Sequence, residues 1–166
     1  NEFGEIGLDN LLIESAIENT LILENGCICC SIRGDLIDTI GDLFAKAQRQ
    51  QIPPFSRILI ETTGLADPGP IITSLQSEIA IADRCHLDRV ITLIDGVQGE
   101  AQTAQHEEAV VQIVQADMGL ISKGDLSSGE AIRLLKERLR QINPALTVET
   151  IERGRVDPDF LFHGAV

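Results

Sequence analysis

Hydrophobic and polar positions along the chain alternate between short apolar runs and longer stretches with helical spacing. Short runs rich in β-branched residues differ from amphipathic helices in both length and period. On these criteria the sequence predicts strands over residues 20–24, 57–61, 89–95, 118–122 and 147–151. The second and third of these, RILIE and RVITLID, are nearly continuous apolar runs that end in an acid. Such runs are typical of central strands that are buried on both faces of a parallel sheet.

Between these runs, apolar positions recur with the period of one helical face. The pattern predicts helices over residues 32–48 and 128–142, and shorter ones over 67–76 and 107–115. Strands that alternate with helices favour crossover connections and helices on both sides of the sheet. We therefore expect an α/β fold, a three-layer sandwich with a mainly parallel sheet.

Composition narrows the class of protein. A chain of 166 residues suits a single domain, residues 1–166. Its 26 acidic residues against 13 Lys and Arg give a net charge of −13, which would repel a nucleic-acid backbone. The longest apolar runs are far too short for a membrane span, and no signal segment opens the chain. The sequence begins with Asn1 rather than Met, so we interpret it as a piece of something longer.

Three of the four cysteines are crowded together in the segment GCICC, as Cys27, Cys29 and Cys30. Thiolates so close in sequence can converge on one soft metal ion such as Zn²⁺, and the start of a helix would favour the thiolate form. The alternatives are a redox pair or small hydrophobic residues. The crowding argues against a secreted disulfide scaffold and favours a reducing, cytoplasmic setting.

The segment Glu61-Thr62-Thr63-Gly64 follows the predicted strand 57–61. Glu61 could hold Mg²⁺ through water, and the N–H of Gly64 could face a phosphate with no side chain in the way. Taken alone, the segment is equally an ordinary turn from a strand into a helix.

The segment Ser122-Lys123-Gly124-Asp125 follows another predicted strand. In such a run the carboxylate of Asp125 would accept hydrogen bonds from the ring N–H and the amine of guanine. The stem of Lys123 would lie along the purine face. The alternative is a Gly-Asp turn that leads into the next helix.

The opening residues contain two glycines and three acids, in the run NEFGEIGLD. They predict a loop whose carboxylates, including Glu2 and Glu5, could reach a cation; the alternative is an acidic solvated loop. No G-x-x-x-x-G-K-[ST] motif occurs anywhere in the sequence, so the loop that would cradle nucleotide phosphates is missing from it.

Four ordered segments together resemble the signatures of the CobW family, P-loop GTPases related to the nickel-delivery proteins UreG and HypB. They are NEFGEIGLD, ENGCICCSIRGDL, RILIETTGLADPGPI and ADMGLISKGDL. The resemblance covers residues 1 to about 154 and implies a P-loop NTPase-like fold. It also implies a GTP-dependent metallochaperone that delivers zinc or cobalt to a client metalloenzyme.

The resemblance assigns a role to each candidate residue. It implies metal ligation by Cys27, Cys29 and Cys30, with Glu2 and Glu5 in a switch loop near the metal. It places Glu61 and Gly64 in the Walker B and switch II region. It also matches Ser122, Lys123 and Asp125 to the guanine-specificity motif, with Ser in place of the commoner Asn.

Two family features are missing from this sequence, the N-terminal phosphate loop with its strand and helix, and the C-terminal domain. We therefore expect a partial GTPase domain, truncated at its N-terminus, that has no turnover of its own and is prone to self-association. The alternative is a non-catalytic zinc-binding module or a thiol-redox module.

Overall fold

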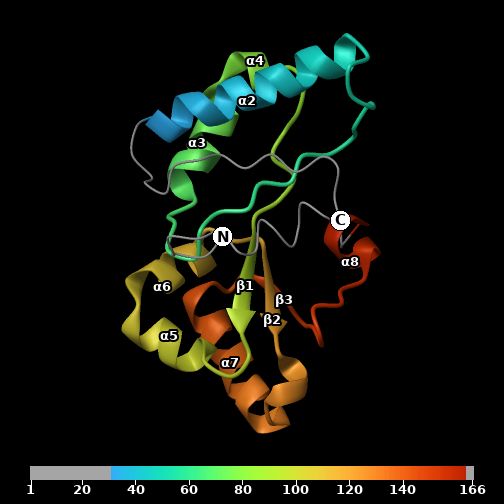
Figure 1. Cartoon of the computed structure of the whole chain (residues 1–166). Helices are drawn as coiled ribbons and strands as arrows, with labels where there is room; N and C mark the ends of the chain where they lie inside the picture. The colour runs from blue at the N-terminus through green and yellow to red at the C-terminus, as the bar shows by residue number, and fades with distance from the viewer. Residues whose placement is uncertain (1–30, 164–166) are drawn as a thin grey trace, which may run out of the picture. The chain divides into compact units, whose positions relative to one another are not determined.

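The computed structural model describes residues 31–163. It divides the chain into two compact units, with the boundary after Leu87. The first unit contains the helices α2 (Ser31–Gln48), α3 (Gly69–Ser77) and α4 (Ile79–Ala82) (Figure 1). The second contains β1 (Ile91–Asp95), α5 (Gly99–Gln105), α6 (Glu107–Val114), β2 (Met118–Ser122), the 3₁₀ turn η1 (Gly124–Leu126), α7 (Gly129–Ile142), β3 (Thr147–Thr150) and α8 (Pro158–His163).

The first unit is built on the apolar face of α2. Leu36 and Ile40, one turn apart, are buried together with Ile81 of α4. Partly buried residues complete this cluster: Ile37, Phe44, Ile58, Ile71, Leu75 and Cys85. The helices predicted over residues 32–48 and 67–76 are confirmed as α2 and α3, within a few residues at each end.

The strand predicted over residues 57–61 is wrong for this structure. That segment has no regular secondary structure, and Leu59 and Ile60 are 80% and 40% exposed. A strand is stable only when a neighbouring strand takes its backbone hydrogen bonds. In the part of the chain that the structure describes, every sheet pairing joins β1, β2 and β3 to one another. The apolar run indicates that this segment favours an extended strand, but none of the described strands pairs with it.

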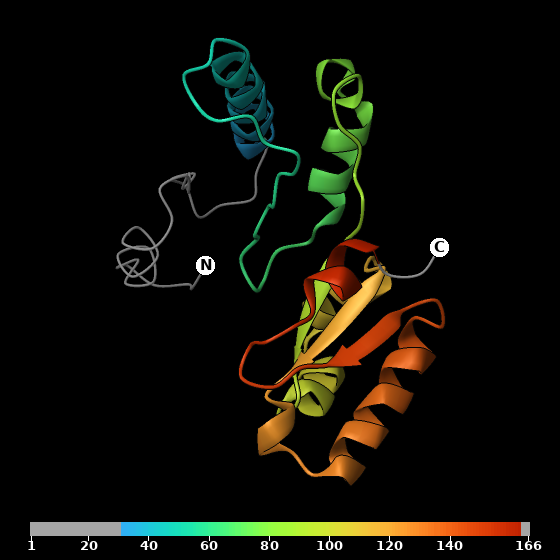
Figure 2. The same cartoon turned by 90° about the vertical axis from the view of Figure 1, so that its right-hand side faces the viewer.

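The second unit contains a parallel sheet of three strands in the order β1-β2-β3 (Figure 2). Its register places Asp95 opposite Ser122 and Ile121 opposite Thr150. Helices α5 and α6 lie between β1 and β2 along the chain, and α7 lies between β2 and β3. The predicted α/β class and parallel sheet are thus confirmed, as are the strands at 118–122 and, with shorter bounds, at 89–95 and 147–151.

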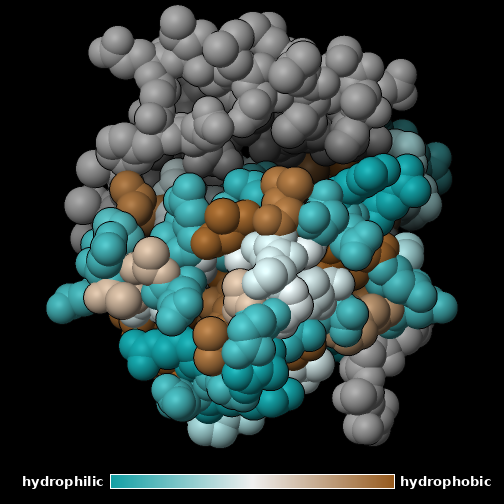
Figure 3. All heavy atoms as spheres, turned by 90° about the horizontal axis from the view of Figure 1, so that it is seen from below, coloured by the Kyte–Doolittle hydropathy of each residue, from teal (hydrophilic) through white to brown (hydrophobic). Residues whose placement is uncertain are grey.

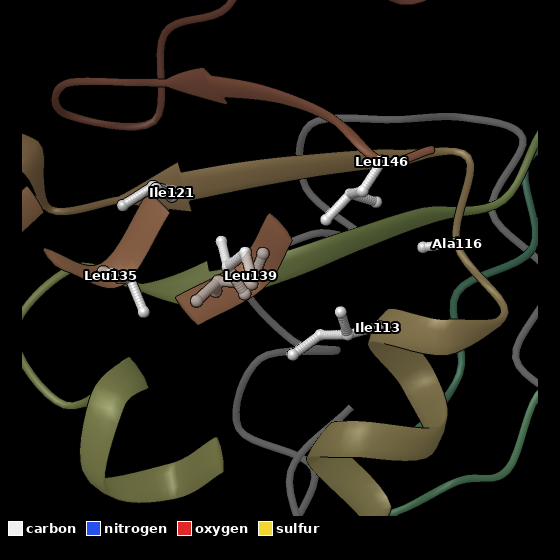
Figure 4. Packing of buried hydrophobic residues seen from close by; sticks show 7 residues of the cluster. Ile113, Ala116, Ile121, Leu135, Leu139 and Leu146 are labelled. Atoms are coloured by element: carbon white, nitrogen blue, oxygen red, sulfur yellow. The ribbon is translucent and has the colours of Figure 1, made fainter. Parts of the chain in front are cut away.

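Each face of β2 packs against helices. On one face the main core brings Ile94 and Ile121 together with Ile113 of α6 and with Leu135 and Leu139 of α7 (Figure 4). On the other face Met118, Leu120 and Ile151 form a smaller cluster with residues of and before α8: Val156, Phe160 and Leu161. All but the last residue of β2 are buried, because helices cover both of its faces.

The prediction that 89–95 is a central strand buried on both faces is also wrong here. β1 lies at the edge of the three-stranded sheet, and its residues alternate between buried and exposed. Leu93 is 71% exposed, whereas Ile94 is 5% exposed. Burial on the second face depends on what packs there, and Phe160 and Leu161 of α8 pack on the cluster that contains Met118 and Leu120 of β2. The fully covered strand is β2.

Helix α5 was not predicted, since its sequence GEAQTAQ has no apolar period. It is anchored instead by small residues, because Gly99 and Thr103 are its buried positions. A Cβ atom at Gly99 would lie 2.8 Å from the Cγ2 atom of Ile94, so the close approach requires glycine. Within residues 31–163, no helix has the length and apolar character that crossing a bilayer demands.

Candidate functional site at the ends of two parallel strands

The carboxyl ends of β1 and β2 lie side by side, so the segments that follow them form one site. Gly96 N–H donates to the carbonyl oxygen of Ser122 at 2.8 Å, and Ser122 Oγ donates to the carbonyl oxygen of Ile94 at 3.2 Å. Further along, Ser127 Oγ donates to the carbonyl oxygen of Gly96 at 2.7 Å. These bonds join residues 122–127, here called the base loop, to the end of β1. Ligands of parallel α/β sheets bind at such ends.

Glycine is required at the point where the two segments touch. A Cβ atom at Gly96 would lie 2.6 Å from the carbonyl oxygen of Ser122, a backbone atom that cannot move without disturbing β2. Gly124 faces β3 in the same way: its N–H donates to the carbonyl oxygen of Ile151 at 3.2 Å, and a Cβ atom would lie 2.5 Å from Cγ2 of Thr150. The base loop is therefore held between two strand ends.

The carboxylate of Asp95, the last residue of β1, is at the centre of this arrangement. Its Oδ1 atom accepts from the N–H groups of Val97 at 2.7 Å and Gln98 at 3.0 Å. Its Oδ2 atom accepts from Nζ of Lys123 at 2.7 Å. The Asp95 side chain is 17% exposed and the Lys123 side chain 55% exposed.

The surroundings of Asp95 favour its ionised form. Burial is the largest single influence and raises the pKa, but it is outweighed by the hydrogen bond from Lys123, the two backbone N–H groups and the nearby positive charge. The net result is that the pKa of Asp95 lies below its ordinary value. Asp95 and Lys123 are therefore an ion pair at neutral pH.

Lys123 has a left-handed backbone, with φ 56° and ψ 31°, a conformation that residues other than glycine adopt at a cost. This bend turns the chain out of β2 and into η1, where Ser127 N–H donates to the carbonyl oxygen of Gly124. The turn exposes Asp125 to solvent. Among residues 31–163, no side chain or backbone group forms a hydrogen bond or salt bridge with its carboxylate, which is thus available to accept N–H donors from a ligand.

Seen from the carboxyl ends of β1 and β2, apolar and polar residues are interspersed over the described part of the surface (Figure 3). Val97, two residues after Asp95, is 55% exposed, and Leu126, which follows Asp125, is 69% exposed. The site therefore combines a carboxylate, an ammonium group and exposed aliphatic side chains, a mixture suited to a flat ring with polar edges.

The predicted residues Glu61 and Gly64 lie in the first unit. Glu61 is exposed, and a tight turn follows it, in which Ala66 N–H donates to the carbonyl oxygen of Thr63 at 3.0 Å. Among the described residues, no atom beyond its chain neighbours lies within 4 Å of where a Cβ atom of Gly64 would be. The turn leads to Asp67, whose Oδ1 atom accepts from Gly69 N–H at the start of α3.

The predicted metal ligands Cys27, Cys29, Cys30, Glu2 and Glu5 lie outside the described residues, as does the predicted strand at 20–24. From residue 31 to 163, the structure contains no group of three or more His, Cys, Asp or Glu side chains arranged to hold a metal ion. The remaining cysteine, at position 85, is a free thiol that packs against the core of the first unit.

The predicted residues Ser122, Lys123 and Asp125 are neighbours in sequence, and in the structure Asp95 joins them. The signal for Asp95 was present in the sequence, because it is the acid that ends the apolar run RVITLID. What the sequence did not provide was the strand register that places it beside Lys123.

Residues 1–150 match the family described as "CobW/HypB/UreG, nucleotide-binding domain". The chain belongs to this family. The CobW/HypB/UreG match includes the base loop, the turn after Glu61 and the cysteine cluster, and it ends at the last residue of β3.

Relatives in this family have related names. The chain is 41% identical over 163 residues to the zinc chaperone YjiA of Escherichia coli (strain K12), covering 98% of this chain and 50% of that protein. It is 29% identical to the zinc-regulated GTPase metalloprotein activator 1 of Schizosaccharomyces pombe, covering 95% of this chain and 39% of the relative. It is 28% identical to the zinc chaperone CobW of Pseudomonas aeruginosa, covering 93% and 48%.

A solved structure shares the fold. The crystal structure of Zn(II)-bound YjiA GTPase from E. coli superposes with a TM-score of 0.70 at 40% sequence identity, over 78% of this chain and 40% of that one. The α/β fold with its parallel sheet is therefore that of the YjiA GTPase. The chain spans half the length, or less, of the curated relatives named above.

Proposed function

We propose that the protein is a GTP-dependent zinc chaperone of the CobW type, and that residues 1–166 form one partial nucleotide-binding domain within it. The observation that carries this proposal is the Asp125 carboxylate, exposed and unengaged among the described residues, on a loop fixed to the ends of two parallel strands. The names of the relatives, zinc chaperones and zinc-regulated GTPase activators, support the same function.

In this proposal the base loop reads guanine. The two oxygens of Asp125 accept from the ring N1–H and the exocyclic amine, a pair of donors that adenine does not present. The stem of Lys123 lies against the purine face. Ser122 supports the loop, because its hydroxyl group already donates to the carbonyl oxygen of Ile94.

Base recognition can be tested in the intact protein by changing one atom of Asp125. An Asp125→Asn amide donates where the carboxylate accepts, so it should weaken GDP binding and favour xanthosine diphosphate, whose ring carries an oxygen in place of the amine. Dissociation constants from calorimetry measure the shift. Glu137→Gln, on the exposed surface of α7, is the matched control and should keep the wild-type preference for guanine. An unchanged preference in Asp125→Asn would refute the assignment.

Glu61 and Gly64, in the first unit, are proposed to act on Mg²⁺ and on a phosphate, as the family resemblance implies. The exposed carboxylate of Glu61 would hold Mg²⁺ through water, and the ion would offset phosphate charge when bound. The N–H of Gly64 would face a phosphate, because glycine has no side chain in the way. Both roles rest on the family resemblance.

The cargo is proposed to bind at Cys27, Cys29 and Cys30, with Glu2 and Glu5 on a nearby switch loop. Zinc is the favoured ion because the relatives are named for it, and cobalt suits the same thiolates. GTP would order the switch loop and so change the affinity for the ion, before transfer to a client metalloenzyme in the cytoplasm.

Linkage makes this coupling measurable. If GTP changes zinc affinity, zinc must change GTP affinity by the same factor. Zinc dissociation constants of the intact protein with a non-hydrolysable GTP analogue and with GDP should therefore differ, and equal values would contradict the coupling. The same experiment with Cys27, Cys29 and Cys30 replaced by Ser should abolish stoichiometric zinc binding.

A zinc-binding or thiol-redox module without nucleotide chemistry is the competing function, and thiol counting separates the two kinds of thiol chemistry. Protection of three thiols by one equivalent of zinc supports ligation, whereas a reversible disulfide without zinc uptake supports redox chemistry. The 166-residue chain contains no phosphate-loop motif, so by itself it should bind Mg²⁺–GTP weakly and show no turnover. Micromolar binding in calorimetry would contradict that expectation.

A further inference from the structure

The Asp95 carboxylate joins two segments that are far apart in sequence. One of its oxygens closes the turn after β1 through the N–H groups of Val97 and Gln98, at 2.7 and 3.0 Å. The other receives Nζ of Lys123 at 2.7 Å. Because each oxygen has its own partners, the turn and the ion pair can be perturbed separately.

The ion pair fixes a side chain that would otherwise be free to move. Lys123 has a flexible four-carbon stem, and more than half of its side chain is exposed. Its backbone is set by the left-handed bend at φ 56°, and its far end is set by Asp95. With both ends held, the stem has a defined direction beside the loop that bears Asp125.

We propose that Asp95 is a positioning residue of the nucleotide site, which holds Lys123 so that its stem can support the purine face while Asp125 reads the purine edge. This inference rests on the proposed guanine site. Asp95 itself does not touch the nucleotide. Asp95 acts through Lys123, whose stem would contact the flat face that all purines share.

A separable signature follows from this division of roles. Loss of the Asp95–Lys123 pair should weaken all purine nucleotides by a similar factor and leave the preference among them unchanged. A change at Asp125 should alter the preference itself. We therefore expect loss of the ion pair to lower nucleotide affinity without altering base selectivity, and a change at Asp125 to alter base selectivity.

The informative variant is Asp95→Asn, because the amide oxygen of Asn still accepts from Val97 and Gln98 while the negative charge that holds Lys123 is gone. The second variant is Lys123→Met, which keeps an aliphatic stem without the ammonium group. If Asp95 acts through Lys123, the two changes should not be additive, and the double variant should bind no more weakly than Lys123→Met alone.

The experiment measures dissociation constants of the intact protein for GDP, inosine diphosphate and xanthosine diphosphate by calorimetry. We expect Asp95→Asn to weaken GDP and inosine diphosphate to a similar extent, by roughly three- to tenfold. Glu137→Gln, an exposed acid on α7, is the control and should match the wild type. Wild-type affinity in Asp95→Asn, or fully additive effects in the double variant, would overturn the proposal.

The outcomes separate this inference from the proposed function. If Asp125→Asn leaves the guanine preference intact while Asp95 and Lys123 remain coupled, Asp125 is misassigned and the positioning role stands. If Asp125→Asn switches the preference but Asp95→Asn has no effect, the positioning role alone is refuted. Failure of the wild-type protein to bind GDP refutes both. Should Asp95→Asn unfold, Lys123→Met keeps the turn after β1 intact, and unchanged GDP affinity in that variant would equally overturn the inference.

Discussion

The side-chain amide of Asn143 joins the end of α7 to the end of α6. Its Nδ2 atom donates to the carbonyl oxygens of Ile113 and Ala116, both at 2.9 Å, while its Oδ1 atom accepts from Ala145 N–H at 3.1 Å. Carbonyl groups in the last turn of a helix have no partner within the helix. Asn143 supplies one from a residue 30 positions away, next to the main core.

Replacing Asn143 with Ala should therefore destabilise the protein. The change leaves carbonyl oxygens in a partly buried position without their donor, which costs about 1–3 kcal/mol. Urea unfolding followed by circular dichroism would measure the difference. Gln141→Ala, two residues earlier and exposed on α7, is the control and should change the unfolding free energy by less than about 0.5 kcal/mol. Equal stabilities of the two variants would contradict the capping role.

A methyl group at Gly96 should disturb the base loop. The new Cβ atom would meet the carbonyl oxygen of Ser122 at 2.6 Å, so the backbone must shift, at a cost of about 1–3 kcal/mol. Nucleotide affinity in the intact protein should fall together with stability. Gly129→Ala is the matched control, because no described atom lies within 4 Å of its Cβ position and alanine favours the helix by up to about 1 kcal/mol. A Gly96→Ala variant as stable as Gly129→Ala would show that the close approach is not maintained.

The ion pair between Asp95 and Lys123 should make stability depend on pH in the acidic range. The pKa of Asp95 is lower in the folded protein than its ordinary value of about 3.9, so folding favours the ionised carboxylate. This contribution is complete above the unfolded pKa and is lost as the pH falls through the folded pKa.

The measurable result is a difference between variants. The unfolding free energy of the wild type should exceed that of Asp95→Asn by a constant amount from about pH 7 to about pH 5, and the gap should shrink below about pH 4. Urea unfolding of both proteins across that range would test it. A gap of the same size at about pH 3 would mean that ionisation of Asp95 is not its source.

The core of the second unit allows a direct test of packing. Leu139 is fully buried between the sheet and α6, so Leu139→Ala should cost about 2–5 kcal/mol through lost burial and the cavity that it leaves. Leu134, on the same helix, is 40% exposed, and Leu134→Ala should cost much less. Chemical denaturation measures the unfolding free energy of the two variants. Similar losses of stability would contradict the central position of Leu139 in the core.

Sequence patterning predicted the second unit well because its elements carry their own signals. The run MGLIS is apolar and flanked by turns, and the 14-residue α7 has a cap at Ser128, whose side chain accepts from Ala131 N–H. Such signals are local. The failures at residues 57–61 and at the outer face of β1 concern which segments become neighbours, a property that no local pattern specifies.

The candidate site was likewise predicted only where its residues are neighbours in sequence. Ser122, Lys123 and Asp125 form a motif that can be read within four residues. The ion pair with Asp95 spans 28 positions and depends on the pairing of Asp95 with Ser122 in the parallel sheet. Asp95 was visible in the sequence only as a strand-terminal acid, and its partner became identifiable once the register of the two strands was known.

Anchoring of residues 122–127 on two sides has a mechanical consequence. Gly96 and Ser127 bind the segment to one strand end, and the Gly124 N–H bond to Ile151 binds it to another. Hydrogen bonds to two strand ends restrict the movement of this segment relative to the sheet. If the segment holds a purine as proposed, a displacement that distinguishes a triphosphate from a diphosphate would arise elsewhere in the protein, while the purine keeps its position.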